Sequence, residues 1–203
     1  EWNKSGAQIM RRFFIFISLH LFLFLLVIAY QAQAEEDEWE VRSFQDMIVA
    51  SVPGEIVHGD KLRFILKKGN CGSLSVLFSF LTYNAPKEIK ELEGKRIPIK
   101  INEEPILSAA DIIVISPAFN NMAHFVMLTS PQAYELANFS NGIMESYNSR
   151  KIFSIELMDD KDFEVEKYFD VTSNEWNLER YPEKISEAYD LCIGPENIEK
   201  YSS

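Results

Sequence analysis

Alternating polar and apolar positions along most of the chain predict a domain built mainly from short β-strands. The clearest segment is 73–81, where the apolar residues at the even-numbered positions all fall on one face of an extended chain. Further strands are predicted from similar patterns at 39–43, 47–52, 61–66, 97–101, 111–116, 124–129, 151–158 and 163–171.

Four of these predicted strands carry a more specific expectation. Pro98 interrupts the isoleucines of 97–101, and because proline cannot donate to a β-ladder, this segment is predicted to be an edge strand. The unbroken Ile/Val run at 111–116 is typical of a strand that is buried on both faces. The segments 151–158 and 163–171 are expected to form a hairpin across the acidic turn between them.

A short helix is predicted in the middle of the chain. Ser130 and Pro131 form a suitable start signal, and the helix is expected over 132–139. The turn-forming sequence Ser-Asn-Gly at 140–142 is expected to end it.

A second helix is predicted near the C-terminus. Pro182 would lie in its first turn and Gly194 would stop it, after an irregular or one-turn segment at 174–181. The residues expected on its buried face are Ile185, Ala188, Tyr189 and Cys192. Together with the strands, this predicts a mainly β fold, either a β-sandwich or a partly open barrel, with a short mid-chain helix and a C-terminal helix.

The segment 10–34 is predicted to be a signal peptide. Arg11 and Arg12 precede an apolar run, and the small residues Ala32 and Ala34 precede an acidic stretch, so cleavage is expected between Ala34 and Glu35. An uncleaved membrane anchor and twin-arginine export remain as alternatives. Residues 1–9 are interpreted as a non-native extension, and 35–203 as a single β-rich domain.

The charge of the domain argues against two classes of partner. The chain has a formal net charge of −11, and its first 34 residues hold three bases but only one acid, so the domain itself is at −13. Nucleic acids and anionic lipid surfaces require clustered Lys and Arg, so neither is expected as a partner, and membrane contact is expected only through an uncleaved leader. A cationic partner or simple solubility would both explain the acidity.

Cys71 and Cys192 are the only cysteines. In an oxidising compartment two cysteines most simply pair, so a disulfide is predicted between them. Two free thiols are the alternative. Cys71 also lies in the sequence 69–73, which resembles the Gly-x-Cys-Gly-Ser run of papain-type cysteine proteases, but the position of that family's nucleophile is occupied by Leu74. Protease chemistry is therefore not expected.

Metal and cofactor sites are not predicted. His58 and His124 stand too far apart for a local zinc site, and His124 is interpreted as a strand or core residue. The acids of 159–164 alternate as in a calcium loop but lack its glycine, so an exposed acidic turn is expected. Asn138 begins a glycosylation sequon, which matters only in a host that glycosylates.

Three short sequences in the C-terminal third resemble the final strand-strand-helix of small bacterial periplasmic proteins. They lie at 151–157, 168–171 and 188–192, and the family with a comparable end is that of invasion-associated locus B. The resemblance implies a β-sandwich that binds or stabilises an unidentified envelope or secreted protein without catalysis.

The sequence therefore predicts an exported, non-catalytic binding or envelope-associated module. The alternative is a secreted hydrolase that uses carboxylates such as Asp111, Asp170 or Glu175. A third class is a structural or inhibitor protein, which would present a large exposed apolar patch without a cleft.

Overall fold

The computed structural model describes residues 38–57, 59–83, 85–102, 107–130 and 133–194, and they belong to one compact unit. Ten strands form its single sheet: β1 Glu40–Phe44, β2 Met47–Pro53, β3 Lys61–Lys67, β4 Asn70–Thr82, β5 Arg96–Ile101, β6 Leu107–Ala118, β7 Ala123–Thr129, β8 Tyr134–Glu135, β9 Ile152–Leu157 and β10 Ser173–Asn177. The helices are α2 Leu136–Arg150 and α3 Tyr181–Ile193, and two 3₁₀ turns are η1 Lys87–Leu92 and η2 Val165–Lys167.

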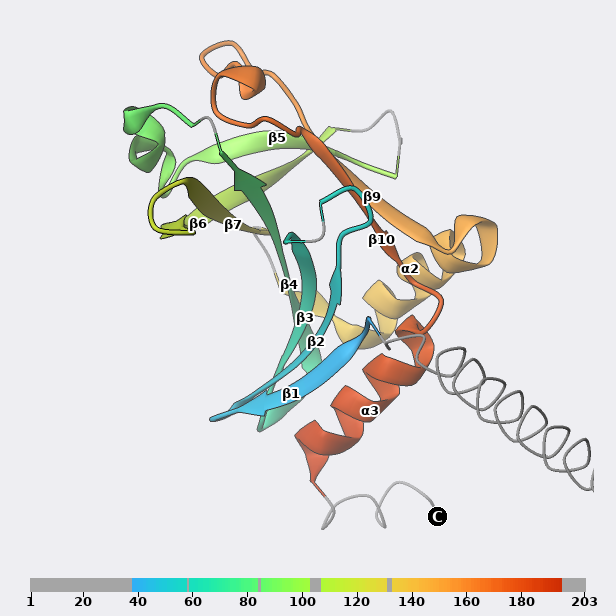
Figure 1. Ribbon diagram of the computed structural model, residues 1–203. Helices are drawn as coiled ribbons and strands as arrows, with labels where there is room; N and C mark the ends of the chain where they lie inside the picture. The colour runs from blue at the N-terminus through green and yellow to red at the C-terminus, as the bar shows by residue number, and fades with distance from the viewer. Residues whose placement is uncertain (1–37, 58, 84, 103–106, 131–132, 195–203) are drawn as a thin grey trace, which may run out of the picture. The chain divides into compact units, whose positions relative to one another are not determined.

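The sheet is antiparallel, open and strongly curved (Figure 1). Its strands follow the order β1-β2-β3-β4-β7-β6-β5-β9-β10, with the short β8 attached to β4. The two halves of the curve approach each other after β2, where the backbone N–H of Glu55 donates to the carbonyl of Glu175 in β10 over 2.8 Å. The predicted mainly β class with two helices is confirmed, and this single wrapped sheet fits the partly open barrel better than a sandwich of two sheets.

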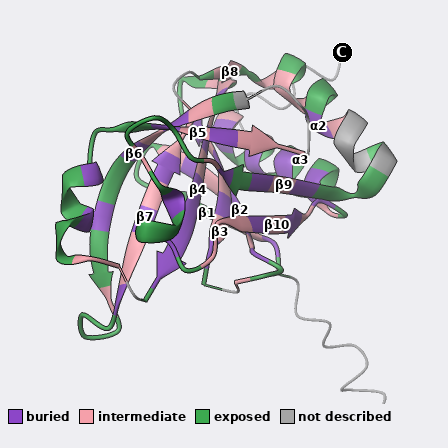
Figure 2. Cartoon of the chain, turned by 90° about the horizontal axis from the view of Figure 1, so that it is seen from above, coloured by how far each residue is buried: buried purple, intermediate pink, exposed green. Residues whose placement is uncertain are grey.

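Both helices pack against the same face of the sheet. Helix α3 contacts β1 to β4, whereas α2 contacts β4 and β9. Phe64 of β3 touches both helices, with ring centroids 6.0 Å from Phe139 of α2 and 5.1 Å from Tyr181 of α3. Buried residues are concentrated between the strands and these helices (Figure 2).

The core follows from the alternation of the strands. In β3 Leu62, Phe64 and Leu66 are fully buried, while the residues between them are only half-buried. The predicted apolar face of β4 is buried in the same way. The alternation of apolar and polar residues therefore predicted correctly which face of each of these strands packs toward the helices.

The predicted disulfide is confirmed. Cys71 at the start of β4 is bonded to Cys192 in the last turn of α3, with Cα atoms 5.9 Å apart. The bond joins residues 121 positions apart, and so ties α3 to the middle of the sheet. The cysteine of the protease-like sequence is thus occupied in a structural bond.

The strand predicted at 163–171 is wrong. Val165 and Phe169 are both buried, but Val165 begins the turn η2 and Phe169 follows just after it, where the N–H of Phe169 donates to the carbonyl of Val165. Asp159 stabilises this turn by accepting from the N–H of Val165 at 2.8 Å. The partner of β9 is instead β10, within the segment 174–181 that was predicted to be irregular.

The end of the mid-chain helix was also predicted wrongly. Helix α2 begins at Leu136 rather than at 132 and continues through the Ser-Asn-Gly sequence to Arg150. Ile143, just beyond that sequence, is buried against the sheet. Tertiary packing of this side chain outweighs the weak helix propensity of the three residues before it.

Pro98 does not mark an edge strand. Strand β5 lies between β6 and β9, and Pro98 pairs with Ala109 of β6. On the other side its carbonyl accepts from the N–H of Met158, just past the end of β9. The missing proline N–H therefore falls where the β9 ladder stops, so an interior strand tolerates it.

The run 111–116 is a strand, but it is not buried on both faces. Ile112 and Ile115 are buried, whereas Ile113 and Val114 are each 42% exposed. The pairing register between β6 and β7 shifts between Ile112 and Val114. Ile113 is therefore an extra residue without a partner in β7, and it lies on the outer side of β6.

The C-terminal helix matches its prediction closely. Pro182 lies in the first turn of α3 and Gly194 caps its end with a φ of 75°. The predicted signal peptide 10–34, its cleavage site after Ala34 and the extension 1–9 lie outside the described residues. Among the described residues, no helix is long and apolar enough to cross a membrane.

Candidate functional site: an apolar cavity under helix α2

A cavity of about 550 Å³ lies between helix α2 and the curved sheet. It is bounded by β4, β5, β6 and β9 and by the chain around β8. Its lining residues are Val76, Phe78, Ile99, Ile101, Asn102, Ser108, Ala109, Ser130, Ala133, Tyr134, Glu135, Asn138, Phe139, Gly142, Ile143, Phe153 and Ile155. The volume falls within the range of about 300–1,000 Å³ that is typical of small-molecule sites.

Aromatic residues hold two opposite walls of the cavity. On one side Phe78 and Phe153 pack against the buried Trp176, with ring centroids 6.5 and 6.4 Å from it. On the other, Phe139 of α2 packs on Tyr134, with ring centroids 4.8 Å apart. The side chains of both walls are thus packed against other aromatic rings.

Polar groups of the cavity gather around β8 and the first turn of α2. The hydroxyls of Ser130 and Tyr134 are hydrogen-bonded at 2.5 Å, and Asn138 Nδ2 donates to Glu135 Oε2 at 2.6 Å. At the β5 end, Asn102 Oδ1 accepts from the N–H of Ser154. An apolar interior with a few convergent polar groups is the usual arrangement of a ligand pocket.

The formal charge of the described cavity lining is negative. Among the described residues that line the cavity, Glu135 carries the only formal charge at neutral pH, and none is Lys, Arg or His. A cofactor held through phosphates would call for cationic side chains or a glycine-rich loop, and the lining offers neither among these residues.

A more open groove of about 490 Å³ lies between α2 and α3. Leu136 and Met144 of α2 face Ile185, Ser186 and Tyr189 of α3 across it. It is a second apolar surface, and it shares Glu135 with the cavity but not Gly142.

Two of the three candidate carboxylates, those of Asp111 and Asp170, have partners of their own in the structure. Asp111 forms a two-point pair with Arg96, with Nε–Oδ1 and Nη2–Oδ2 distances of 2.6 and 3.0 Å, and these hydrogen bonds lower the pKa of Asp111. Asp170 Oδ2 accepts from Thr82 Oγ1 at 3.1 Å and from the N–H of Tyr83 at 2.5 Å.

Glu175 lies on the edge strand β10, and its backbone carbonyl accepts from Glu55. None of the three acids belongs to the described lining of the cavity. The hydrolase alternative therefore has no shared site for them in this part of the chain, and stays a prediction.

The other predicted chemistry is placed as follows. His58 lies outside the described residues. His124 lies in β7 opposite Thr82, and its Nδ1 has no hydrogen-bond partner within the described part of the chain. No cluster of three or more metal-ligating side chains occurs among the described residues, including the acidic turn after β9. Asn138 is exposed and lines the cavity.

A buried carboxyl that the sequence did not reveal closes the two halves of the sheet. Asp60, which is fully buried, accepts from the N–H of Leu81 at 2.5 Å and from Asn174 Nδ2 at 2.8 Å. Asn174 Oδ1 accepts in turn from the N–H groups of Ile56 and Glu175. Burial raises the pKa of Asp60 to about 7, although its hydrogen bonds and the nearby charge of Arg63 oppose this.

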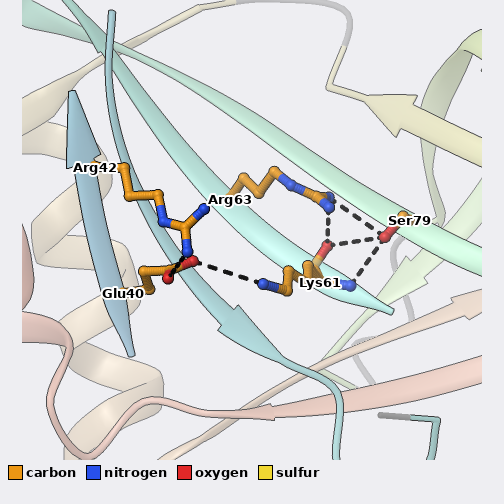
Figure 3. Close-up of polar contacts among 5 residues, drawn as sticks. All are labelled: Glu40, Arg42, Lys61, Arg63 and Ser79. Atoms are coloured by element: carbon orange, nitrogen blue, oxygen red, sulfur yellow. Dashed lines mark hydrogen bonds and ion pairs between the residues drawn. The ribbon is translucent and has the colours of Figure 1, made fainter. Parts of the chain in front are cut away.

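Arg63 connects this closure to a polar ladder on the outer face of the sheet (Figure 3). Its Nη1 donates to the carbonyl of Lys61 and to Ser79 Oγ, both at 3.3 Å. Lys61 pairs with Glu40 at 3.7 Å, and Glu40 also contacts Arg42. Because surface ion pairs contribute little, this ladder is interpreted as support for the strands rather than as a site.

The sequence pattern could not locate the cavity. Its apolar lining residues look like ordinary core positions, since alternation shows which face is buried but not whether the facing element fills the space. The one available signal was Gly142, a glycine within a helix, although the Ser-Asn-Gly sequence predicted a helix end at this position.

No protein-family model matches the chain, and no curated protein or solved structure matches it significantly. The resemblance to the invasion-associated locus B family stays a prediction.

Proposed function

We propose that this protein is an exported, non-catalytic binding module that holds a small apolar molecule in the cavity under helix α2. The observation that carries the proposal is the cavity itself: about 550 Å³, walled by aromatic and aliphatic side chains, with most of its polar groups around β8 and the first turn of α2. A mainly apolar pocket of this size that opens to solvent on one side and carries a few polar groups is the usual form of a small-molecule site.

Export is the second part of the proposal. The Cys71–Cys192 disulfide is consistent with an oxidising extracellular or periplasmic space. The predicted signal peptide supports the same compartments. In such a space a carrier or receptor of apolar molecules would meet ligands that water alone dissolves poorly.

The test uses a cavity-filling variant and two matched controls. N-phenylnaphthylamine, an uncharged dye that brightens in apolar surroundings, is titrated into the purified protein. Gly142 lines the cavity, and a Cβ built there meets no atom within 4 Å. We expect Gly142→Phe to fill the cavity and remove dye binding, and Gly142→Ala to keep it.

Ser186→Phe is the second control, because Ser186 lines only the groove between α2 and α3. It should leave dye binding unchanged. Absence of saturable dye binding to the wild-type protein, or loss of binding with Ser186→Phe but not with Gly142→Phe, would contradict the proposal. Circular dichroism of each variant checks that the fold is retained.

A further inference from the structure

We propose that the cavity selects amphiphiles with an uncharged or cationic head group and discriminates against those with an anionic one. This inference rests on the proposed function, and it specifies the chemical class of the ligand. It is carried by the charges and hydrogen-bonding groups on the polar side of the cavity.

The first argument is the absence of a cation to receive an anionic head. No Lys, Arg or His is found among the described lining residues, and the formally charged residue there is Glu135. Carboxylate and phosphate groups are bound through charge-assisted hydrogen bonds, chiefly from Arg or Lys. An anionic head at this exposed side of the cavity would gain no such bond, whereas Glu135 would repel it.

The second argument concerns the start of helix α2. A helix N-terminus attracts anions, and the N-terminus of α2 borders the cavity. However, Glu135 is the residue directly before this helix, and its carboxylate accepts from Asn138 of the first turn. The negative charge that this helix end favours is thus already supplied by the chain, and a second anion would be repelled by it.

The third argument is that the polar groups present suit a neutral head. The hydroxyls of Ser130 and Tyr134, 2.5 Å apart, and the amide of Asn138 can donate and accept. They match an alcohol, ester or amide. A cationic head would gain in addition from Glu135. The net charge of −11 adds a weaker repulsion of anions that salt screens.

The experiment compares three ligands with one apolar chain. Decanol, decanoate and decyltrimethylammonium, each below its micelle-forming concentration, compete with N-phenylnaphthylamine for the purified protein at a pH where decanoate is ionised. We expect decanol and decyltrimethylammonium to displace the dye, and decanoate to bind about tenfold more weakly than decanol.

Glu135→Gln tests the source of the selectivity. The amide oxygen can still accept from Asn138, so the helix start is retained while the charge is lost. The variant should bind decanoate more tightly and decyltrimethylammonium more weakly than the wild type. Glu166→Gln, at an exposed glutamate of η2 outside the cavity, removes the same charge and should change neither.

The outcomes separate the two proposals. If none of the three ligands displaces the dye, the proposed function itself fails. If decanoate binds as tightly as decanol, the function stands and the selectivity is overturned. If Glu135→Gln and Glu166→Gln shift the affinities equally, the selectivity comes from net charge, and its assignment to Glu135 is wrong.

Discussion

The two helices cover the same face of one sheet, but they cover it in different ways. The α3 arm, defined as β1–β4 with α3, is tightly filled: Tyr181, Ile185, Ala188 and Cys192 are buried against its strands. The α2 arm, defined as β5, β6, β9 and β10 with α2, forms the cavity together with Val76 and Phe78 of β4. Of the α2 side chains that the structure describes, only that of Ile143 is buried in the core.

This difference indicates a division between scaffold and site. Helix α3 is held by packing and by a covalent bond to β4, so its position depends little on what binds nearby. Helix α2 contains Asn, Ser and Gly in its first half and rests on few buried side chains. Regions with few buried apolar contacts open at lower cost, which suits the proposed binding of a ligand beneath α2.

The largest expected effect is loss of the disulfide in the α3 arm. In the chain-entropy model a bond that closes a loop of 121 positions contributes about 4–5 kcal/mol. Replacing Cys71 and Cys192 together by alanine should lower the free energy of unfolding by nearly this amount, measured by urea denaturation. Affinity for the dye should change little. Two alkylatable thiols in the untreated wild-type protein would show that the bond does not form.

The second prediction compares phenylalanines of the two arms. Phe64 is fully buried, so Phe64→Ala should cost about 3–5 kcal/mol of stability. Phe139 is half-buried and already borders open space, so Phe139→Ala should cost only about 1–2 kcal/mol but should weaken dye binding. Equal losses of stability in urea denaturation would remove the contrast between the arms.

The third prediction concerns the closure between the arms. Asp60 has a folded-state pKa of about 7 against 3.8 for a free side chain, so between these pH values the folded protein retains a proton that the unfolded chain has lost. The stability from this group is complete below pH 3.8 and is lost as the pH rises through about 7, by up to about 4 kcal/mol.

The uncharged variant Asp60→Asn isolates this contribution from the other carboxylates. The amide brings a second donor toward Asn174 Nδ2, so the variant should be less stable than the wild type. The stability difference between the two proteins should shrink as the pH rises from 3.8 toward 7. A difference that stays constant over this range in urea denaturation would contradict the prediction.

The smallest expected effect is that of Gly142→Ala in α2. Gly142 has an ordinary helical conformation with open space at its Cβ, so alanine should stabilise the helix by about 0.5–1 kcal/mol. Amide hydrogen exchange of α2 should slow accordingly, while that of α3 stays unchanged. Unaltered exchange in α2 would mean that its stability does not depend on the glycine.

Sequence patterning was most reliable where one physical cause acts alone. Alternation in β3 and β4 reports burial of one face, and it predicted their core residues correctly. It failed at 163–171, where two buried residues four positions apart give a pattern like that of a strand. It also failed at β10, where Asn174 is buried although its side chain is polar. A polar residue satisfied by distant partners cannot be distinguished from a loop residue by local pattern.

The candidate site was largely beyond sequence reasoning. Of its lining residues the sequence singled out Ser130 as a helix start, Asn138 for its sequon and Gly142 as a helix end, and none of them as part of a cavity. Their meeting depends on α2 spanning from β4 to β9, strands 70 positions apart at their nearest ends. The spacing of residues within one segment cannot show that two strands so far apart in the sequence lie beside the same helix.

The sequence by itself determined the mainly β class, the burial faces of the central strands, the C-terminal helix and the pairing of Cys71 with Cys192, because each follows from short-range periodicity or from having one possible partner. Only the tertiary structure decided the order of the strands, the closure through Asp60 and the cavity beneath α2. These features arise where segments remote in the chain meet, and whether such segments fill the space between them is a property of packing in three dimensions.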